Sequence, residues 1–506
     1  MEASKEGTIE TQVPQKKQNS LRWWILLTVI VGTFLGRLDQ TIVNLALPKI
    51  INDFSISISA AGWIATAYIL ANAIFVPIWG KLGDTIGRKK VYLLGFGIFI
   101  IGSVLAGLAW NLPSMIVFRV IQAIAGSADY PTAMAIIAVT FAEGKERAQA
   151  LGIWSSSFAA ASVFGPLLGG PLIDLFGWRS VFLINLPIGL LGIFMAMRFI
   201  NESRSEQKTT YFDWWGAITL GISLSSLVLV LDKGADWGWL SVGSFVCYAL
   251  VCVFMAIFIK IEQRVPEPIV DLRFFKIPAF VNTLMNNFVI FMGMMGGLFL
   301  IPIFAQTFLG YNATESGYLF MPMAAALLLA APIGGALTGR VQARYVIFWS
   351  TIVAAIGLYF FSFLDPRSTA LDIIWPLSIM AFGMGFGMAQ RTNIIASVVD
   401  KNEIGIASSI LALARNVAGA LGIALFGTIL NNRIEHNILS INSLSSLNST
   451  NPVDVQTFTS LVMLKAQVNA YDYVFLISAL LVFVGAFAVL FMKVEKERTD
   501  VTVHVE

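Results

Sequence analysis

The sequence has few charged residues and very few histidines and cysteines. Asp, Glu, Lys and Arg make up 12% of its 506 residues, whereas 57% are hydrophobic. A soluble protein of this length is not expected to be so apolar. Apolar stretches of about 20 residues recur along the chain, which is the length that a helix needs to cross a bilayer. The sequence therefore predicts an all-α polytopic membrane protein.

The scarcity of histidine and cysteine argues against several kinds of site. His436 and His504 lie outside the apolar stretches, so no buried histidine dyad is expected. Cys247 and Cys252 share one apolar stretch and would face different sides of a helix, which argues against a disulfide or a metal site. No GxxxxGK[ST] sequence is present, so direct use of ATP is not expected. We therefore expect no enzyme, no cofactor and no metal.

Hydropathy indicates fourteen membrane spans, which places both termini on one side. Most of the 33 Lys and Arg residues fall on the cytoplasmic side if that side holds the termini, as the positive-inside rule requires. The predicted order is a cytoplasmic tail (1–21), a six-helix bundle (22–200), a linker (201–278) with two inserted helices (214–231 and 241–260), a second six-helix bundle (279–492) with a long outer loop (431–472), and a cytoplasmic tail (493–506).

A short basic loop is repeated at matching places in the two bundles. Gly80–Lys90 reads GKLGDTIGRKK, and Gly335–Tyr345 reads GALTGRVQARY. Membrane transporters are often built from repeated halves whose interface holds the substrate. The repeat therefore predicts two equivalent six-helix units around a central cavity.

Motifs along most of the chain carry a family resemblance. They are Gly80, Leu82, Gly83, Asp84, Gly87, Arg88 and Lys89 in the loop, Leu38–Pro48 in the first span, Arg119, Gln122 and Gly126 in the fourth, Gly165–Gly170 in the fifth, Pro268–Leu272, and Arg415 with Asn416. These resemble the major facilitator superfamily, in particular its fourteen-helix drug:proton antiporters of the EmrB/QacA type. The resemblance implies that fold and proton-driven drug efflux. Thr85, Arg37, Asp129 and Arg391 depart from the family pattern.

The basic loop suggests a conformational switch. Gly80, Gly83 and Gly87 permit a tight reversal and close helix approach, and Arg88 offers a hydrogen-bond donor to Asp84. The resemblance implies that Asp84 latches onto the cytoplasmic start of the thirteenth span in one state and releases it in another. The alternative is that the loop only anchors the topology through its positive charges.

The fifth span contains the sequence GPLLGG. Gly165, Gly169 and Gly170 provide small residues on a helix face, and Pro166 adds a bend. Such a stretch suits either ordinary helix packing or, as the resemblance implies, a flexible contact between the two halves.

Proton coupling is expected from charges inside the first bundle. Asp39 lies about 25 Å from the cytoplasmic start of the first span. Arg119 lies about 9 Å from the outer start of the fourth span, so the two residues can meet at equal depth in the membrane. Burial and a neighbouring arginine act in opposite directions on a carboxylate and can bring it close to its titration point. We expect Asp39 to carry the proton, Arg119 to be its partner and Gln122 to add a hydrogen bond. A static structural ion pair is the alternative.

A second acid and a second-half arginine lie deeper. Asp129 follows Arg119 by ten residues on the same helical face, and Arg391 lies at a comparable depth in the other half. They could form a bridge that closes the cytoplasmic side in one state. Alternatively, Arg391 could reach the membrane surface with its long side chain. If the bridge forms, Asp129 is a second titratable or gating group. The sequence indicates no partner for Arg37.

The evidence on the substrate is indirect. Soft methionines and polar groups in the spans suggest an adaptable cavity, although such side chains also serve for packing. The candidate cavity residues are Arg37, Gln122, Tyr130, Met292, Met295, Gln390, Arg415 and Asn416. The spans hold more arginines than acids, so lipophilic neutral, zwitterionic or anionic compounds suit the cavity as well as monocations.

These features favour a proton-coupled multidrug efflux transporter that works by alternating access in the cell membrane. A dedicated exporter of one anionic metabolite or lipid is the alternative. The expected partners are a small molecule, the bilayer and, in a two-membrane bacterium, a periplasmic adaptor; nucleic acid is not expected. A sensor or channel would need a soluble domain or a continuous polar stripe, and neither is visible.

Overall fold

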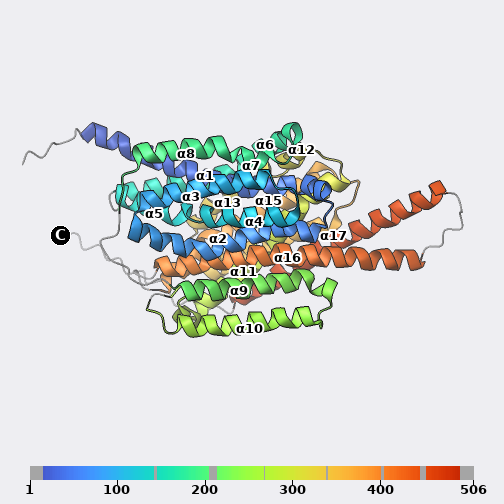
Figure 1. Ribbon diagram of the computed structural model, residues 1–506. Coiled ribbons are helices and arrows are strands. Elements are labelled where there is room, and N and C mark those ends of the chain that lie inside the picture. Colours follow the sequence, from blue (N-terminus) through green and yellow to red (C-terminus); the bar gives the residue numbers. More distant parts are fainter. Residues whose placement is uncertain are drawn as a thin grey trace, which may run out of the picture.

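The computed structural model describes residues 15–141, 145–203, 213–266, 268–337, 340–399, 404–444 and 452–490. The secondary structure of these residues is helical throughout, and most helices run side by side along one direction (Figure 1). The start of α1 and the junction of α2 with α3 lie at one end, which we call the near side. The opposite end, the far side, carries a projecting pair of helices, α16 and α17.

The first half is built from eight helical segments. They are α1 (Gln15–Phe54), α2 (Ile58–Ile86), α3 (Arg88–Gly107), α4 (Leu112–Gly126), α5 (Asp129–Thr140), α6 (Lys145–Phe176), α7 (Ser180–Leu183) and α8 (Asn185–Phe199). Segments α4 and α5 continue one another across a short turn, as do α7 and α8. The half therefore has the six-helix layout that the sequence predicted.

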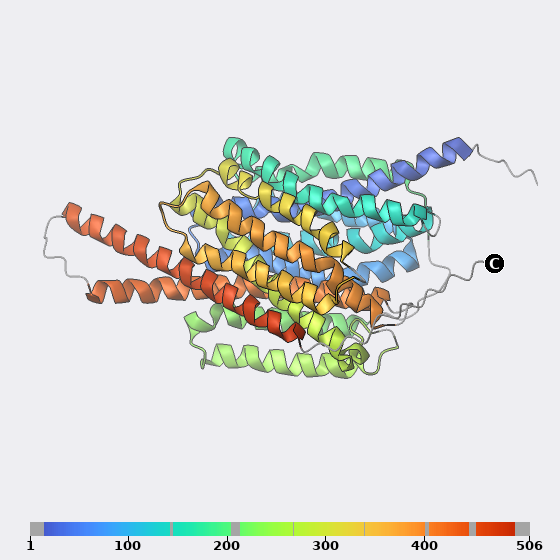
Figure 2. The same ribbon diagram turned by 180° about the vertical axis from the view of Figure 1, so that it is seen from behind.

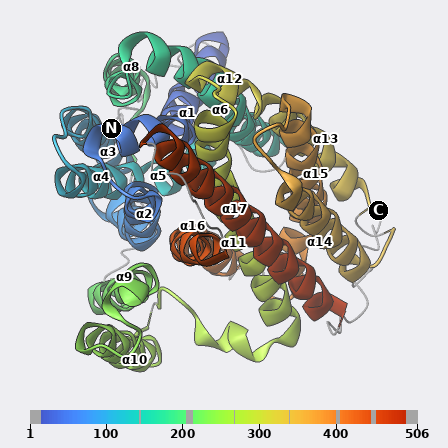
Figure 3. The ribbon, with the colours of Figure 1, turned by 90° about the vertical axis from the view of Figure 1, so that its right-hand side faces the viewer.

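The inserted pair and the second half follow. They comprise α9 (Trp214–Trp237), α10 (Val242–Glu262), η1 (Leu272–Lys276), α11 (Pro278–Phe308), α12 (Ala313–Tyr318), α13 (Met321–Ala336), α14 (Ala343–Phe360), η2 (Phe361–Phe363), α15 (Ala370–Ser397), α16 (Ile404–Leu444) and α17 (Pro452–Leu490). Viewed along the bundle, α9 and α10 lie outside the two halves (Figure 3). Helix α9 contacts α2 and α16, and α10 packs against α9.

Twelve helical stretches in the described part of the chain are long and apolar enough to cross a membrane. The predicted spans 113–140 and 149–172 are not among them. The first is divided into α4, with 15 residues, and α5, with 12. In the second, the stretch Phe164–Phe176 is an apolar helix that is too short to cross a membrane by itself. The all-α class is confirmed, whereas the count of fourteen spans stays a prediction for these two.

Side chains at the helix starts explain several boundaries. The first amides of a helix have no partner within it, so a polar side chain just before the helix stabilises its start. Asn111 and Ser114 form a reciprocal pair of hydrogen bonds at the start of α4. Asp213 accepts from the Gly216 amide at 2.7 Å and begins α9. Ser241 does the same for α10.

The region 431–472, predicted as a long outer loop, is helical over most of its length. Helix α16 continues to Leu444 and α17 begins at Pro452, so the two form a hairpin that projects from the far side (Figure 2). The two helices pack against each other, and Asn437 Nδ2 donates to the carbonyl of Ala466 at 3.1 Å. The prediction was wrong because hydropathy averages do not register a helix whose apolar face covers only one neighbour.

A structural carboxylate stabilises the short helix at the end of the linker. Asp271 precedes η1 and accepts hydrogen bonds from the Arg273 side chain, the shortest at 2.6 Å. These bonds hold the pKa of the Asp271 carboxyl below its ordinary value. Asp271 lies in the Pro268–Leu272 motif, to which the sequence gave no structural role.

A buried acid fastens the inserted pair to the first half. Asp232 of α9 is 3% exposed and accepts hydrogen bonds from Ser59 and, at 2.6 Å, from Trp63 Nε1, both on α2. Along the same contact, Gly221 brings α9 close to Ile74 of α2. The inserted helices are therefore attached to a helix of the interface between the halves.

The variant Asp232→Ala should lower the free energy of unfolding by about 1–3 kcal/mol, because it leaves two buried donors without their acceptor. The measurement is thermal unfolding of the purified full chain in one detergent. Glu435→Ala, which removes an exposed acid of α16, is the control and should leave the melting temperature unchanged. Equal melting temperatures for both variants would show that the Asp232 bonds contribute nothing.

Candidate functional site

A fully buried aspartate lies at the centre of the first half. Asp39 of α1 has no exposed surface. Arg119 Nη1 of α4 donates to Asp39 Oδ2 at 2.5 Å. Gln122 Nε2, one helical turn later, donates to Asp39 Oδ1 at 2.9 Å, and its own Oε1 accepts from Arg119 at 2.7 Å. The three side chains meet as the sequence predicted, and their role in coupling stays a prediction.

Two further residues of this network were missed from the sequence. Asn185, at the start of α8, donates to Asp39 Oδ1 at 2.8 Å and to Ser103 Oγ of α3 at 2.8 Å. Both are fully buried. Gly102 permits the arrangement, because a Cβ there would lie 2.8 Å from the Gln122 backbone. The signal that could have found Asn185 is an amide side chain within an otherwise apolar span.

Aromatic rings enclose the charged pair. The Arg119 guanidinium lies 4.0 Å from the ring centre of Tyr68 and 5.7 Å from that of Phe182. Arg119 is 2% exposed, so the pair lies in a medium of low dielectric constant where charge interactions are strong. Neutralising one member of such a pair leaves the other as an uncompensated charge. A proton on Asp39 would therefore change the environment of Arg119 at once.

The second acid of the first half lies deeper, at the α4–α5 junction. Thr33 Oγ1 donates to Asp129 Oδ2 at 2.7 Å, and Trp154 Nε1 of α6 donates to Thr33 Oγ1 at 2.9 Å. Asp129 Oδ1 is buried and has no hydrogen-bond partner among the described residues. Arg37, for which the sequence indicated no partner, donates from Nη1 to Gln40 Oε1 at 3.2 Å and acts electrostatically on Asp129.

A small cavity borders Asp129. Its volume is about 20 Å³, enough for one water-sized molecule. It is lined by Gly32, Leu35, Gly36, Tyr92, Gly95, Phe96, Phe99, Ala125, Gly126, Ala128 and Asp129. The walls other than Asp129 and Tyr92 are apolar, so the carboxylate is the principal polar group that a molecule there would meet. This is a suitable place to exchange a proton.

The predicted bridge between Asp129 and Arg391 is not formed in this structure. Arg391 is 1% exposed and is bound within its own half. Its Nε donates to Asn286 Oδ1 at 2.9 Å, and its Nη2 donates to Ser350 and Thr351 at 3.1 and 2.9 Å. Its side chain does not reach the membrane surface either. Neutral acceptors on α11 and α14 satisfy the guanidinium, which the depth argument from sequence could not anticipate.

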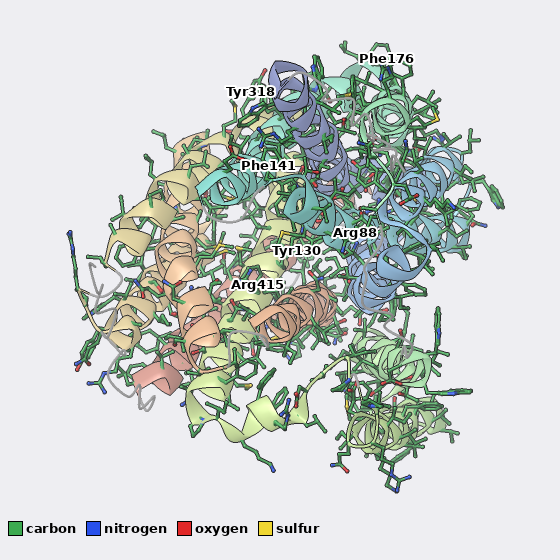
Figure 4. The ribbon with its side chains drawn as sticks, turned by 90° about the vertical axis from the view of Figure 1, so that its left-hand side faces the viewer. Arg88, Tyr130, Phe141, Phe176, Tyr318 and Arg415 are labelled. Carbon is green, nitrogen blue, oxygen red and sulfur yellow. The ribbon has the colours of Figure 1, made fainter. Side chains whose placement is uncertain are left out.

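Arg415 of α16 faces the first half. Its Nε donates to Asn287 Oδ1 of α11 at 3.3 Å, and its guanidinium lies 5.2 Å from the ring centre of Phe291. Arg415 and Tyr130 of α5 lie near one another in the middle of the bundle (Figure 4), and they interact electrostatically. Tyr130 is 43% exposed, so its ring is accessible from outside.

The other candidate cavity residues differ in position. Gln390 is buried and donates to the Gly334 carbonyl at 3.0 Å, which joins α15 to α13. Met292 and Met295 are half-buried and pack against the glycines of α16. Asn416 is half-buried next to Arg415. Gln390 therefore links two helices of the second half by a hydrogen bond, and Met292 and Met295 of α11 lie against α16.

The loop between α2 and α3 has the reversal that its glycines predicted. Gly87 has φ +119°, a conformation that favours glycine, and its Cβ would meet the carboxylate of Glu202. Glu202 accepts from the Lys89 and Lys90 amides at 3.1 and 3.3 Å and so stabilises the start of α3. The sequence missed this role of Glu202.

The loop between α2 and α3 contacts α5 and Ser203. A Cβ at Gly80 would lie 3.3 Å from Pro131, and one at Gly83 would lie 3.5 Å from Thr132, so both glycines face α5. The main-chain amide of Arg88 donates to the Ser203 carbonyl at 3.0 Å. The predicted latch between Asp84 and the cytoplasmic start of the thirteenth span rests on side chains outside the described part.

The GPLLGG segment lies in tight contacts of α6. A side chain at Gly165 would collide with Thr41 of α1, and one at Gly169 would lie 2.9 Å from Ile42. A Cβ at Gly170 would meet the backbone of Thr314 in α12, which belongs to the other half. A Cβ at Gly317 of α12 would lie 2.6 Å from the carbonyl oxygen of Pro166. The segment therefore lies at the contact between halves, and its gating role stays a prediction.

An acid near this segment holds the far side closed. Asp174 of α6 accepts from the Thr314 amide at 2.9 Å, from Thr314 Oγ1 at 2.7 Å and from Lys49 Nζ at 3.1 Å. Gln306 of α11 donates to the Leu45 carbonyl at 3.1 Å. The two halves thus meet on the far side.

These features define a transporter fold with two helical halves around a central polar site. The family model of the major facilitator superfamily matches residues 29–423, and the chain belongs to that family.

Curated relatives agree with the resemblance to the EmrB/QacA type. The multidrug transporter protein MdtP of Bacillus subtilis is 33% identical over 434 residues, which cover 86% of this chain and 78% of MdtP. The multidrug export protein EmrB of Haemophilus influenzae is 30% identical and covers 85% of this chain and 84% of its own length. The chain is thus similar to transporters over most of its length and is not an enzyme.

A solved structure supports the fold. The crystal structure of a bacterial homologue of the human lysosomal transporter Spinster, in its inward-facing and occupied conformation, matches with a TM-score of 0.69 at 18% identity. The match covers 93% of this chain and 96% of that one.

Proposed function

We propose that this protein is a proton-coupled efflux transporter that exports lipophilic compounds by alternating access. The observation that carries the proposal is the fully buried Asp39, bound by Arg119, Gln122 and Asn185 within one half. An ionisable group inside a membrane protein is costly and is generally functional. The names of MdtP and EmrB support multidrug efflux.

The coupling steps follow from the chemistry of this network. In the state open to the near side, Asp39 is ionised and paired with Arg119, and a substrate can enter. After the change to the state open on the far side, the substrate leaves and Asp39 binds a proton. Loss of the negative charge frees Arg119, so the two protonation states favour different packing of α1 against α4. Return to the first state releases the proton on the near side.

The cellular setting completes the proposal. The protein lies in the plasma membrane with the near side and both termini in the cytoplasm, as the distribution of Lys and Arg favours. The proton is the only coupling ion and no cofactor takes part. In a two-membrane bacterium, a periplasmic adaptor would approach from the far side.

Proton movement tests the proposal directly. The purified full chain is placed in liposomes that contain a pH-sensitive dye, and anionic, neutral and cationic aromatic compounds are added in turn. We expect at least one compound to cause proton movement that protein-free liposomes lack. The absence of proton movement with every compound, while a labelled compound still crosses, would contradict proton coupling.

A dedicated exporter of one anionic metabolite or lipid is the second candidate. This function is favoured by Arg391 and Arg415, because the hydrogen-bond partners of both guanidinium groups in the described part of the chain are neutral. The same liposome measurements separate the two functions, since a dedicated exporter would respond to one compound class alone.

Asp129→Asn should slow proton release without abolishing transport. Asp129 borders a small cavity on the path from Asp39 toward the near side, and the amide can relay hydrogen bonds but cannot carry the charge. We expect fewer protons moved per substrate than in the wild-type protein, measured from dye and substrate signals together. Thr33→Val, which removes the hydrogen bonds to Asp129 and from Trp154 but keeps the carboxylate, should have a smaller effect. An unchanged ratio in Asp129→Asn would remove this residue from the pathway.

A further inference from the structure

Two buried hydrogen-bond donors without partners lie together on α11 and α16. Arg415 and Asn287 are joined by the bond from Nε to Oδ1, so their side chains share one site. Arg415 Nη2 and Asn287 Nδ2 are both shielded from solvent and have no hydrogen-bond partner among the described residues. Buried donors are nearly always paired in proteins. Two adjacent unpaired donors therefore suit a ligand that brings acceptor oxygens.

The charges around this site favour an anion. Arg415 interacts electrostatically with Arg391 and with Arg37, so three guanidinium groups contribute to the positive potential at this site. Asp39 is already paired with Arg119, and Asp129 is bound by Thr33 and faces Arg37. The arginines of this region thus exceed the acids among the described residues. A positive surplus in a low-dielectric site attracts negative charge strongly.

The surroundings favour an aromatic or otherwise apolar body attached to that anion. The Phe291 ring lies against the Arg415 guanidinium and covers one of its faces. Phe288 and Met292 on the same helix are half-buried, and methionine adapts to different shapes. Tyr130 of the first half lies near Arg415 (Figure 4), and its exposed ring offers an aromatic surface to a flat molecule.

We propose that Arg415 and Asn287 form the anion-binding part of the central site, and that the transported compounds include amphipathic molecules with one carboxylate, sulfonate or phosphate on an apolar body. Arg415 Nη2 and Asn287 Nδ2 donate to the anionic oxygens, while the apolar body lies between Phe291 and Tyr130. The proposal rests on the efflux function proposed above and gives that function a substrate class.

A matched pair of probes separates charge from shape. We would measure equilibrium binding of tritiated 1-naphthoate and of tritiated 1-naphthalenemethanol to the full chain in lipid nanodiscs, with empty nanodiscs subtracted. The two molecules share the naphthalene ring and differ in the carboxylate. In Arg415→Gln, we expect affinity for naphthoate to fall about tenfold or more, because a charge-assisted hydrogen bond is lost. Affinity for the alcohol should change less than about twofold.

Companion variants guard against a folding defect. Arg415→Lys keeps the charge but loses the forked geometry and should be intermediate for naphthoate. Asn287→Ala should weaken naphthoate and spare the alcohol. Arg433→Gln removes an arginine from the far-side extension of the same helix, where it lies 4.3 Å from the Tyr473 ring centre, and should bind both probes as the wild type does.

The outcomes decide between anion recognition and a structural role. Unchanged naphthoate binding in Arg415→Gln, or an equal loss for both probes, would overturn the proposal. Nanodiscs with increasing phosphatidylglycerol identify the source of the anion. Competition by this lipid in the wild type, but not in Arg415→Gln, would assign the site to a lipid headgroup, and its absence would assign it to a soluble anion. If naphthoate fails to bind while neutral compounds still drive proton movement, the efflux function stands and only the substrate class is wrong.

Discussion

Asp39→Asn should abolish the uphill movement of substrate while the protein still folds. The asparagine has the shape of the protonated carboxyl and keeps an acceptor oxygen for Gln122 and Asn185, but it cannot release a proton. With one proton exchanged per substrate and one pH unit across the membrane, the wild type can maintain about a tenfold substrate gradient. The variant should maintain none and should only equilibrate the substrate.

The measurement is substrate accumulation in liposomes under an imposed pH gradient. Asp53→Asn is the matched control, because it neutralises an ion-paired aspartate that is exposed near the far end of the same helix. The control should accumulate substrate as the wild type does. A normal gradient in Asp39→Asn would mean that Asp39 and Arg119 form a static structural pair.

Gly170→Val should trap the transporter away from the state seen here. A side chain at Gly170 meets the Thr314 backbone, and backbone atoms cannot move aside as a flexible side chain would. The far-side contact between α6 and α12 would open, and the Asp174 bonds to Thr314 would break. Since alternating access needs both states, we expect transport to fall at least about tenfold.

Spin labels on the far side can report this opening. Leu175 of α6 and Leu371 of α15 are exposed and belong to different halves. In a background without Cys247 and Cys252, the distance between labels at these positions should lengthen in Gly170→Val. Gly97→Val is the matched control, because a Cβ at Gly97 meets nothing within 4 Å. Equal label distances in the wild type and Gly170→Val would refute the role of this contact in closure.

The sequence predicted the central pair because helix geometry determines depth. Asp39 and Arg119 lie in adjacent spans at equal height, and few other charges compete for them. Asn185 and Ser103 could not be placed, because their contact with Asp39 depends on how α3 and α8 are rotated about their axes. Rotation is decided by packing, such as the close approach that Gly102 allows.

The same limitation applies to the bridge predicted between Asp129 and Arg391, which is absent from this structure and stays a prediction for a state closed on the cytoplasmic side. Asp129 and Arg391 have comparable depth, but depth does not determine which face a side chain occupies. Arg391 is directed into its own half by Asn286 and Thr351, neutral residues to which the sequence gave no role.

Hydropathy identified the spans better than it identified what joins them. The helical hairpin of α16 and α17 beyond the bundle was taken for a loop, since its Asn- and Ser-rich composition masks one apolar face. The role of Asp232 was also missed, because the predicted helix ended one residue before it.

The most direct measurement of the central claim uses both first-half acids together. Internal pH and labelled substrate are recorded simultaneously in liposomes that contain the wild type or Asp39→Asn combined with Asp129→Asn. We expect the wild type to move protons and substrate in opposite directions. We expect the double variant to carry substrate only down the substrate's own concentration gradient, with no change in internal pH. Uphill substrate movement coupled to protons in the double variant would contradict the account.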